Sequence, residues 1–476
     1  MHPVDLAIFA VYILGMLGFG YFFFRKNKGG DDYYVGGRKM NSLHIGLSVV
    51  ATDVGGGFSI GLGGLGLTMG LSGSWMLFTG LIGAWMAAVL LIPKVKQNPA
   101  FDKAYTFPQL FGHYFSPNVA FVAAIISAIG YAGFTSSQML AGAKLASGTF
   151  ADLDVQTALY IMGFVAVVYT VMGGLKAVIY TDTIQWTLLM VGLIFVGVPI
   201  SYMEIGGYDA IVATVDPAML TLTNLSWQNV VYWAVTIIPI WFVGMTLYQR
   251  IYACRDEKTA KKAWYFAGLF EWPVMAFLGV LLGLFARVAA DQGMFDYLGA
   301  ADISDTDPET GLPMLLRTVL PVGFLGVMMA AYFSAILSTA DSCLMASSGN
   351  VVTDLIGRFT KFDPDSGGFV KISQAVTLII GVLALILASA MENVLTLMLD
   401  SYAFMVSGLF VPVIGALYWK RSTPAGAMAA MIIGGSTTLS LRYLEVGLPY
   451  NLDPNLFGIT ASAIAFVAVS LITKED

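Results

Sequence analysis

A row of small, oxygen-bearing side chains lies in an apolar stretch near residue 340. Ala335, Ser338, Thr339 and Ser342 follow the spacing i, i+3, i+4 and i+7, so they would share one face of a helix. This face offers hydroxyl and carbonyl oxygens without a thiol or an imidazole, which favours Na⁺ or Ca²⁺ over a transition metal. Asp341 flanks the row. The alternative is ordinary packing of Ser and Thr between helices.

A glycine-rich tract near residue 55 could supply further oxygen ligands. Ala51 to Gly61 reads ATDVGGGFSIG, and successive glycines favour unwinding of a helix. Unwound backbone inside a bilayer is tolerated where it lines a cavity, and its free carbonyls suit a hard cation. Asp53 lies at this break. A carboxylate at that depth costs about 2.5–3.5 kcal/mol, so we expect it to face a cation or a donor. Capping of the second half-helix is the alternative role for Asp53.

Two more acids lie in apolar stretches. Asp182 and Gln185 are one helical turn apart, and Asp182 is either a buried polar group or a residue facing the cytoplasm near the membrane surface. Glu271 directly precedes Trp272-Pro273, and the sequence assigns it no role.

The composition indicates what kind of elements must position these groups. Of 476 residues, 57% are hydrophobic and 11% are charged, against roughly 25% charged in an average soluble domain. We therefore predict an all-α polytopic membrane protein. Runs of about 20 apolar residues are long enough to cross a bilayer, and thirteen of them are predicted, at 6–24, 44–70, 73–93, 117–148, 155–173, 177–203, 229–248, 263–288, 315–348, 369–391, 394–418, 424–445 and 455–473.

The basic residues predict the orientation of these spans. The first apolar run has no preceding Lys or Arg, which argues against a secretory signal. Lys and Arg cluster on alternate connections, Arg250 among them, and this predicts an N-terminus outside and a C-terminus in the cytoplasm. The exceptions are Lys144, Arg287, Arg317 and Arg442. We expect a multi-pass protein of the plasma (inner) membrane. The net charge of −6 argues against nucleic-acid binding, and no obligate protein partner is evident.

A second interruption matches the first. The span at 229–248 contains Pro239 and Gly244, and Pro removes a backbone donor from a helix. It opens a second set of five spans, and because five is odd this set must be inverted relative to the first. Paired interrupted spans in inverted halves indicate a secondary transporter. We predict one transporter domain over 1–476, with repeats at 44–203 and 229–418, an additional N-terminal span at 6–24 and two additional C-terminal spans within 424–473.

Several short motifs, in order, resemble one family. They are Tyr34-Val-Gly-Gly-Arg38, the glycine-rich break, Gly173-Gly-Leu with Thr181-Asp182 and Gln185, Tyr248-Gln249-Arg250 with the basic loop Lys258–Lys262, Leu337-Ser-Thr-Ala-Asp-Ser342, and Asp354. In these motifs the chain resembles the sodium/solute symporters, which include the sodium/proline and sodium/galactose transporters. The resemblance covers roughly Gly36 to Trp419 and implies a leucine-transporter-type core of two inverted five-helix repeats with discontinuous helices.

The resemblance also implies a set of sodium ligands. The principal site would use the backbone carbonyls of Ala51, Val54 and Ala335 and the hydroxyls of Ser338 and Thr339. Members with a second sodium site use an acid at the position of Asp182 and polar groups such as Ser338, Asp341 and Ser342, which could hold Na⁺ or a proton here.

The implied solute site lies beside the first break. Asp53 matches an acid that the proline branch also carries. In the choline branch an aromatic cage holds a quaternary ammonium, but Gly244 stands where one cage Trp would be, so that cage is dismantled. The predicted solute-binding residues are Asp53, Gly55, Gly56, Phe134, Gln138, Trp241, Gly244 and Tyr402.

These features predict a secondary transporter rather than an enzyme. The hypothesis is a symporter that couples inward Na⁺ movement to uptake of a small organic solute by alternating access. A small amino acid or related amine is favoured because Asp53 could meet an ammonium group. The alternatives are a monocarboxylate, a choline-like cation or a sugar, and, from different classes, an ion channel or a non-transporting receptor.

Overall fold

The computed structural model describes residues 2–25, 30–150, 153–299, 307–360, 363–364, 366–444 and 447–473. Within these ranges the regular elements are helices, and no strand is present. The predicted all-α fold is therefore confirmed. Lys26 and Lys28, which contributed to the predicted orientation, and the C-terminal residues 474–476 lie outside the described ranges.

Ten helical segments of the described chain are long and apolar enough to cross a membrane, or eleven if one bent pair counts as a span. Two of the ten are 38 and 50 residues long, well beyond the roughly 20 residues that one crossing needs. They contain breaks at Gly70 (φ 68°) and Gly174 (φ 67°), which adopt a backbone conformation that favours glycine. Counting each of these two as two crossings, and the bent pair as one more, would give thirteen, and that number stays a prediction.

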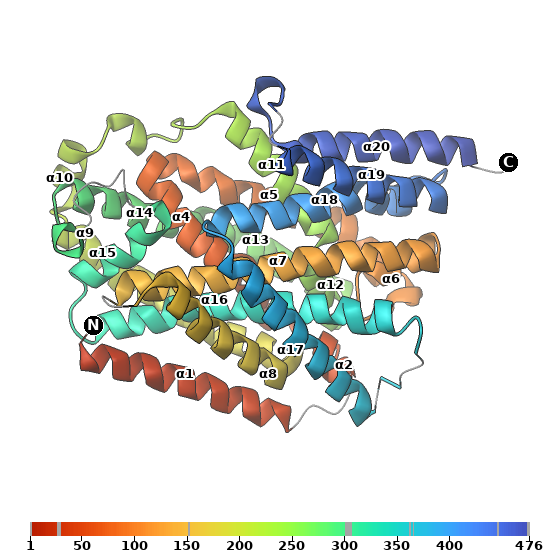
Figure 1. The fold of residues 1–476 in the computed structure, drawn as a ribbon, viewed down its shortest axis with the longest axis horizontal. Coiled ribbons are helices and arrows are strands. Elements are labelled where there is room, and N and C mark those ends of the chain that lie inside the picture. Colours follow the sequence, from red (N-terminus) through yellow and green to blue (C-terminus); the bar gives the residue numbers. More distant parts are fainter. Residues whose placement is uncertain are drawn as a thin grey trace.

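Among the candidate membrane spans, the most deeply buried is the one that contains α16 (Phe324–Gly349), the helix with the row of hydroxyls. In the apolar window of its span 89% of the residues are buried, against 17% for α1 (Pro3–Phe24). Figure 1 shows α1 along one side of the bundle and α19 (Pro424–Tyr443) and α20 (Pro454–Thr473) along the opposite side. The predicted extra spans therefore enclose a core centred on α16.

Two long helices hold α16 in place. These are α7 (Pro117–Thr149) and α8 (Val155–Gly192), and α17 (Gly367–Ser389) packs across both of them. The other helices of the bundle and its connections are α2 (Gly30–Val35), α5 (Trp75–Lys96), α6 (Pro108–Tyr114), α9 (Val198–Glu204), α10 (Gly207–Thr214) and α18 (Val394–Tyr418).

The predicted break in the glycine-rich span is confirmed and is shorter than expected. Helix α3 (Ser42–Asp53) ends at the acid, and α4 (Gly56–Met69) begins three residues later. Only Val54 and Gly55 leave the helical path, because the next two glycines already form the first turn of α4. The carbonyls freed by the break are therefore confined to a few residues.

The second break lies at Gly244 rather than at Pro239. Helix α11 (Trp227–Val243) runs through Pro239, and α12 (Met245–Ala253) follows at a bend of 41°. The predicted span ended at residue 248, because Gln249 and Arg250 lower its hydropathy. The helix continues to Ala253, so the prediction that Arg250 lies in a cytoplasmic connection was wrong.

Two further interruptions were not predicted. The span predicted at 263–288 divides into α13 (Glu257–Leu269) and α14 (Ala276–Asp291) around the π-helical turn η5 (Phe270–Met275), where Trp272 has non-helical dihedral angles. The span predicted at 315–348 begins only at Phe324, since the preceding residues form a separate helix, α15 (Gly311–Val319). That helix ends before Pro321, and a residue that precedes proline disfavours the helical conformation.

Candidate functional site

Three of the predicted sodium ligands meet where α3 ends beside α16. The Thr339 hydroxyl lies 3.0 Å from the Ala51 carbonyl oxygen, to which it donates, and 3.3 Å from the Ala335 carbonyl oxygen. All three residues are buried. One hydroxyl and two carbonyls within this spacing form an oxygen-only donor set, which suits a hard cation such as Na⁺.

The other two predicted ligands are close by but engaged elsewhere. The Ser338 hydroxyl donates to the Asp182 carboxylate at 2.5 Å. The Val54 carbonyl accepts a hydrogen bond of 2.9 Å from the Ser59 hydroxyl of α4. A cation bound at Thr339 could recruit both oxygens once these hydrogen bonds rearrange.

Side chains on one face of α7 accept hydrogen bonds from the backbone at both helix breaks. The Gln138 amide oxygen accepts a hydrogen bond of 2.6 Å from the Gly56 N–H, at the first turn of α4. The Tyr131 hydroxyl accepts one of 3.3 Å from the Thr246 N–H, at the first turn of α12. The two α7 residues are seven apart and therefore share a helix face. Sequence reasoning had included Gln138 and had missed Tyr131 and Thr246.

The break requires a residue without a side chain at Gly55. A Cβ atom there would lie 2.1 Å from the Thr339 hydroxyl and 2.5 Å from the Gln138 amide oxygen. Gly55 thus lets the unwound backbone touch both the hydroxyl row of α16 and the capping amide of α7. Its neighbour Gly56 is equally close to Ala141 of α7.

Asp53 is buried at the end of α3 and does not cap the next helix. It is 7% exposed, one carboxylate oxygen accepts no hydrogen bond, and no side chain of α3 caps α4. The capping alternative therefore has no support in this structure, since the Gln138 amide takes that position.

The predicted aromatic residues divide into two groups. The rings of Phe134 and Tyr402 pack edge to face with centroids 4.8 Å apart, and they join α7 to α18. Trp241 of α11 instead packs near Trp264 and fills the space left by Gly83 of α5.

Arg250 is the charged residue of the site that sequence reasoning missed. Its side chain has no exposed surface. The guanidinium donates to the Ser342 hydroxyl (2.6 Å), the Thr52 hydroxyl (2.8 Å) and the Asp182 carboxylate (3.4 Å). Asp182 also accepts hydrogen bonds from Ser48 and Ser338. One signal was available: an ionisable residue in an apolar helix usually faces the protein interior and has a partner.

Two of the three residues predicted for a second cation site meet at Arg250, and the site itself stays a prediction. Asp182 and Ser342 are brought together, and the positive charge between them is the Arg250 guanidinium. Asp341 lies apart: the Thr170 hydroxyl donates to one of its carboxylate oxygens, and the other oxygen accepts no hydrogen bond.

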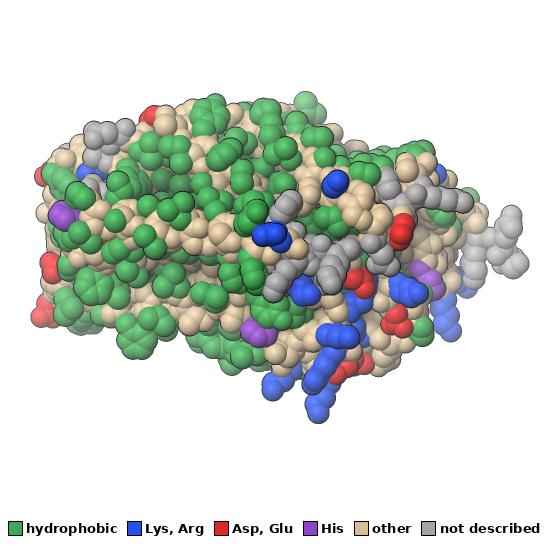
Figure 2. Space-filling model, turned by 90° about the horizontal axis from the view of Figure 1, so that it is seen from below, with side chains coloured by type: hydrophobic (Ala, Val, Ile, Leu, Met, Phe, Trp, Pro, Cys, Tyr) green, Lys and Arg blue, Asp and Glu red, His purple; other side chains and the backbone are tan. Residues whose placement is uncertain are grey.

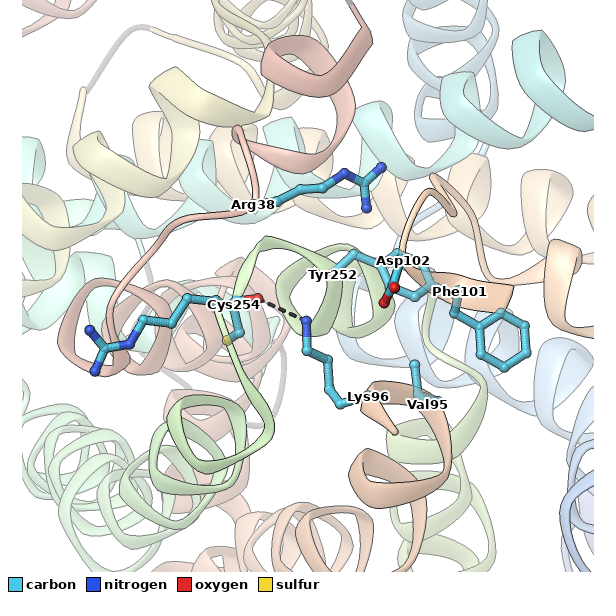
Figure 3. Close-up of a pocket in the computed structure, with 8 residues that line it drawn as sticks. Arg38, Val95, Lys96, Phe101, Asp102, Tyr252 and Cys254 are labelled. Atoms are coloured by element: carbon cyan, nitrogen blue, oxygen red, sulfur yellow. Dashed lines mark hydrogen bonds between the residues drawn. The ribbon is translucent and has the colours of Figure 1, made fainter. Parts of the chain in front are cut away.

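The surface of the molecule is consistent with a membrane protein. Figure 2 shows apolar side chains over most of one face and Lys and Arg side chains gathered toward one end. At the last turn of α12, a cavity of about 170 Å³ lies between Arg38, Lys96 and Arg255. In Figure 3 the Lys96 ammonium donates to the Cys254 carbonyl oxygen across this cavity. None of the predicted ligands lines it.

Comparison with known proteins assigns the family. Residues 33–434 match the sodium:solute symporter family. The chain belongs to the sodium:solute symporter family. It is a Na⁺-coupled solute transporter of the membrane and not an enzyme, as its sequence predicted.

Similar symporters take different solutes. The osmoregulated proline transporter of Bacillus subtilis (strain 168) is 28% identical, with 98% of this chain and 94% of that protein covered. The sodium/proline symporter of Escherichia coli (strain K12) is 27% identical, with coverage of 98% and 93%. The sodium/glucose cotransporter of Vibrio parahaemolyticus is 27% identical, with coverage of 99% and 91%.

A solved structure has the same fold. An outward-open, substrate-bound Na⁺-coupled sialic acid symporter superposes with a TM-score of 0.81 at 20% identity, over 99% of this chain and 98% of that one. This similarity confirms the leucine-transporter-type fold. The repeat boundaries at 44–203 and 229–418 stay predictions.

The symporter carries a second buried ion cluster at the other end of α7. The Lys144 ammonium lies 2.5 Å from Asp307 and 2.6 Å from Glu309. Glu309 also accepts the N–H groups of Val394 (2.9 Å) and Leu395 (2.8 Å). The connection before α15 is thereby tied to the first turn of α18, while the Arg250 cluster ties α12 to α3, α8 and α16. Charged contacts thus tie separate helices of the bundle together in two places.

Proposed function

We propose that this symporter couples inward Na⁺ movement to uptake of a small amino acid or related amine by alternating access. The proposal places it in the plasma membrane with its N-terminus outside and its C-terminus in the cytoplasm. The observation that carries it is the juxtaposition of three features at one helix break: the oxygens around Thr339, the N-terminus of α4 and the buried acid Asp53.

In this proposal Na⁺ binds between α3 and α16. The Thr339 hydroxyl already touches carbonyls of both helices, so a cation there would strengthen the contact between them. Release of Na⁺ into a low-sodium cytoplasm would weaken the same contact and let α3 move. Na⁺ and solute would then each raise the affinity for the other, typically by about 1–3 kcal/mol.

The solute would lie across the first break. The N-terminus of a half-helix favours a carboxylate, and the Gly56 N–H is now satisfied by the Gln138 amide oxygen, which a carboxylate could replace. Asp53, three residues earlier, offers the opposite charge to an ammonium group. The two ends of this site therefore suit a zwitterion, and the proline transporters among the relatives support an amino acid. A sugar would leave the Asp53 carboxylate without a cation.

The test is uptake by the purified protein in liposomes. L-Proline, glycine betaine, choline, acetate and glucose would be offered under an inward Na⁺ gradient and, as the control, an equal K⁺ gradient. We expect Na⁺-driven accumulation of L-proline. Accumulation of glucose or acetate alone would contradict the amino-acid proposal, and accumulation that is equal in K⁺ would contradict Na⁺ coupling.

Loss of the Thr339 hydroxyl should weaken Na⁺ binding selectively. In Thr339→Ala the site loses an oxygen ligand and the hydrogen bond between α3 and α16. We expect the Na⁺ concentration for half-maximal uptake to rise by about tenfold, which corresponds to roughly 1.4 kcal/mol. Thr339→Ser keeps the oxygen and should stay close to wild type.

The matched control is Thr149→Ala. Thr149 is as deeply buried, on α7, and its hydroxyl donates to a carbonyl of its own helix. Thr149→Ala should leave the Na⁺ concentration for half-maximal uptake unchanged. An unaltered Na⁺ dependence in Thr339→Ala would remove the proposed cation site.

A further inference from the structure

Glu271 is a buried acid for which the proposed cycle has no role. It lies in η5, the π-helical turn between α13 and α14, and its side chain has no exposed surface. Among the described residues, no N–H or O–H donates to either of its carboxylate oxygens. A buried carboxylate without donors costs several kcal/mol unless a cation joins it or a proton neutralises it.

The Glu271 carboxylate faces the first helix break. It interacts with Asp53, at the end of α3, whose carboxylate also has an oxygen without a donor. Helix α5 leaves room for the Glu271 carboxylate at Gly80, where a Cβ atom would lie 2.2 Å from it. Two buried carboxylates thus lie close together at the end of α3, and among the described residues neither forms an ion pair with a Lys or Arg side chain.

We propose that Glu271 and Asp53 together bind the positively charged amine of the solute, and that they select amines with at least two N–H donors. This inference rests on the proposed function, because it concerns the same solute site. A secondary or primary ammonium would donate one N–H to each carboxylate and neutralise part of their charge. Glu271 is thereby a specificity-determining residue.

An ammonium suits this pair better than a second metal ion does. A hard cation prefers several oxygen ligands from different groups, and the described residues contain no group of three or more His, Cys, Asp or Glu side chains placed to hold a metal. The hydroxyls and free carbonyls gather instead around Thr339. On α5, Gly80 and Gly83 lie one helical turn apart and make room for Glu271 and the Trp241 indole respectively.

The test compares two solutes in two proteins. L-Proline has two N–H donors on its charged nitrogen, and N-methyl-L-proline has one while keeping its charge. Binding of each would be measured by calorimetry in saturating Na⁺. In the wild type we expect N-methylation to weaken binding by about tenfold or more, because one buried carboxylate loses its donor.

Glu271→Met removes the second carboxylate. It should lower both the affinity for L-proline and the ratio of the affinities for the two solutes. L-Proline binding should weaken by about tenfold, and the ratio between the two solutes should fall to about threefold or less. The variant removes two buried carboxylate oxygens that have no donor and adds no new polar group, so it should fold. A rise in the thermal midpoint of the variant on addition of Na⁺ alone would verify that it folds.

Gly80→Ala displaces the Glu271 carboxylate but keeps its charge. It should change the ratio of the affinities for the two solutes in the same direction. Glu204→Met, at the exposed end of α9, is the control and should match wild type.

The outcomes separate this inference from the proposed function. A wild type that neither binds nor takes up L-proline contradicts the amino-acid function and the inference with it. A wild type that transports L-proline, with the same solute ratio in Glu271→Met, contradicts the inference alone. If Glu271→Met changes the Na⁺ concentration for half-maximal uptake but leaves the ratio of the affinities for the two solutes unchanged, Glu271 is a sodium ligand. That result would also overturn the inference.

Discussion

Replacement of Arg250 by methionine is expected to lower the free energy of unfolding by about 3–5 kcal/mol. The guanidinium and the Asp182 carboxylate have no exposed surface, so the variant would leave a buried carboxylate without its cation. Hydroxyls of α3 and α16 would lose a donor at the same time. The measurement is denaturant unfolding of the purified protein in mixed micelles.

The partner substitution distinguishes a charge effect from a packing effect. Asp182→Asn alone leaves the guanidinium unpaired and should also destabilise strongly. The double variant Arg250→Met/Asp182→Asn removes both charges, so its loss should be smaller than the sum of the single losses.

The control is Arg255→Met, five residues further along, where 67% of the side chain is exposed. It should change the unfolding free energy by no more than about 0.5 kcal/mol. Strict additivity of Arg250→Met and Asp182→Asn would show that the pair does not stabilise the fold.

Replacement of Lys144 by methionine is expected to cost about 3 kcal/mol of unfolding free energy. The ammonium is nearly buried, as is Glu309, while Asp307 is partly exposed. Loss of the cation would leave Glu309 with only the two N–H groups of α18 as donors. This loss of unfolding free energy should be at the lower end of the range of about 3–5 kcal/mol for a broken buried pair, because Asp307 can turn toward solvent. Unfolding in mixed micelles would again measure it.

Arg287→Met is the matched control for this second cluster. Arg287 pairs with Asp291 four residues later on α14, and both side chains are about one-quarter to one-third exposed. Such a pair contributes only about 0–1 kcal/mol. Equal losses in Lys144→Met and Arg287→Met would contradict a structural role for the buried cluster.

Local patterns could be predicted because they depend on residues close together in the chain. The break at Val54 and Gly55 follows from the conformational freedom of glycine, and the shared face of Ser338 and Thr339 follows from helix periodicity. The second interruption, predicted from Pro239 and Gly244 together, is present, but the sequence did not say which of the two residues forms it. Pro239 is accommodated inside α11, while Gly244 forms the bend.

Arg250 shows the limit of hydropathy. A count of apolar residues treats a charge as evidence for a membrane surface, and it cannot register that a partner on another helix neutralises that charge. Asp182 is 68 residues away along the chain. Only the packing of α12 against α3, α8 and α16 brings the two together.

The sequence alone determined that this protein is a helical membrane transporter, where its glycine-rich span breaks, and that one face of the helix over 335–342 carries hydroxyls. These properties follow from composition and from the periodicity of single helices. The tertiary structure decided which groups meet: the Thr339 hydroxyl with the Ala51 carbonyl, the Gln138 amide with the Gly56 N–H, and the Glu271 carboxylate with Asp53. The reason is that each pair joins separate helices, whose relative rotation and depth are set by packing across the whole bundle.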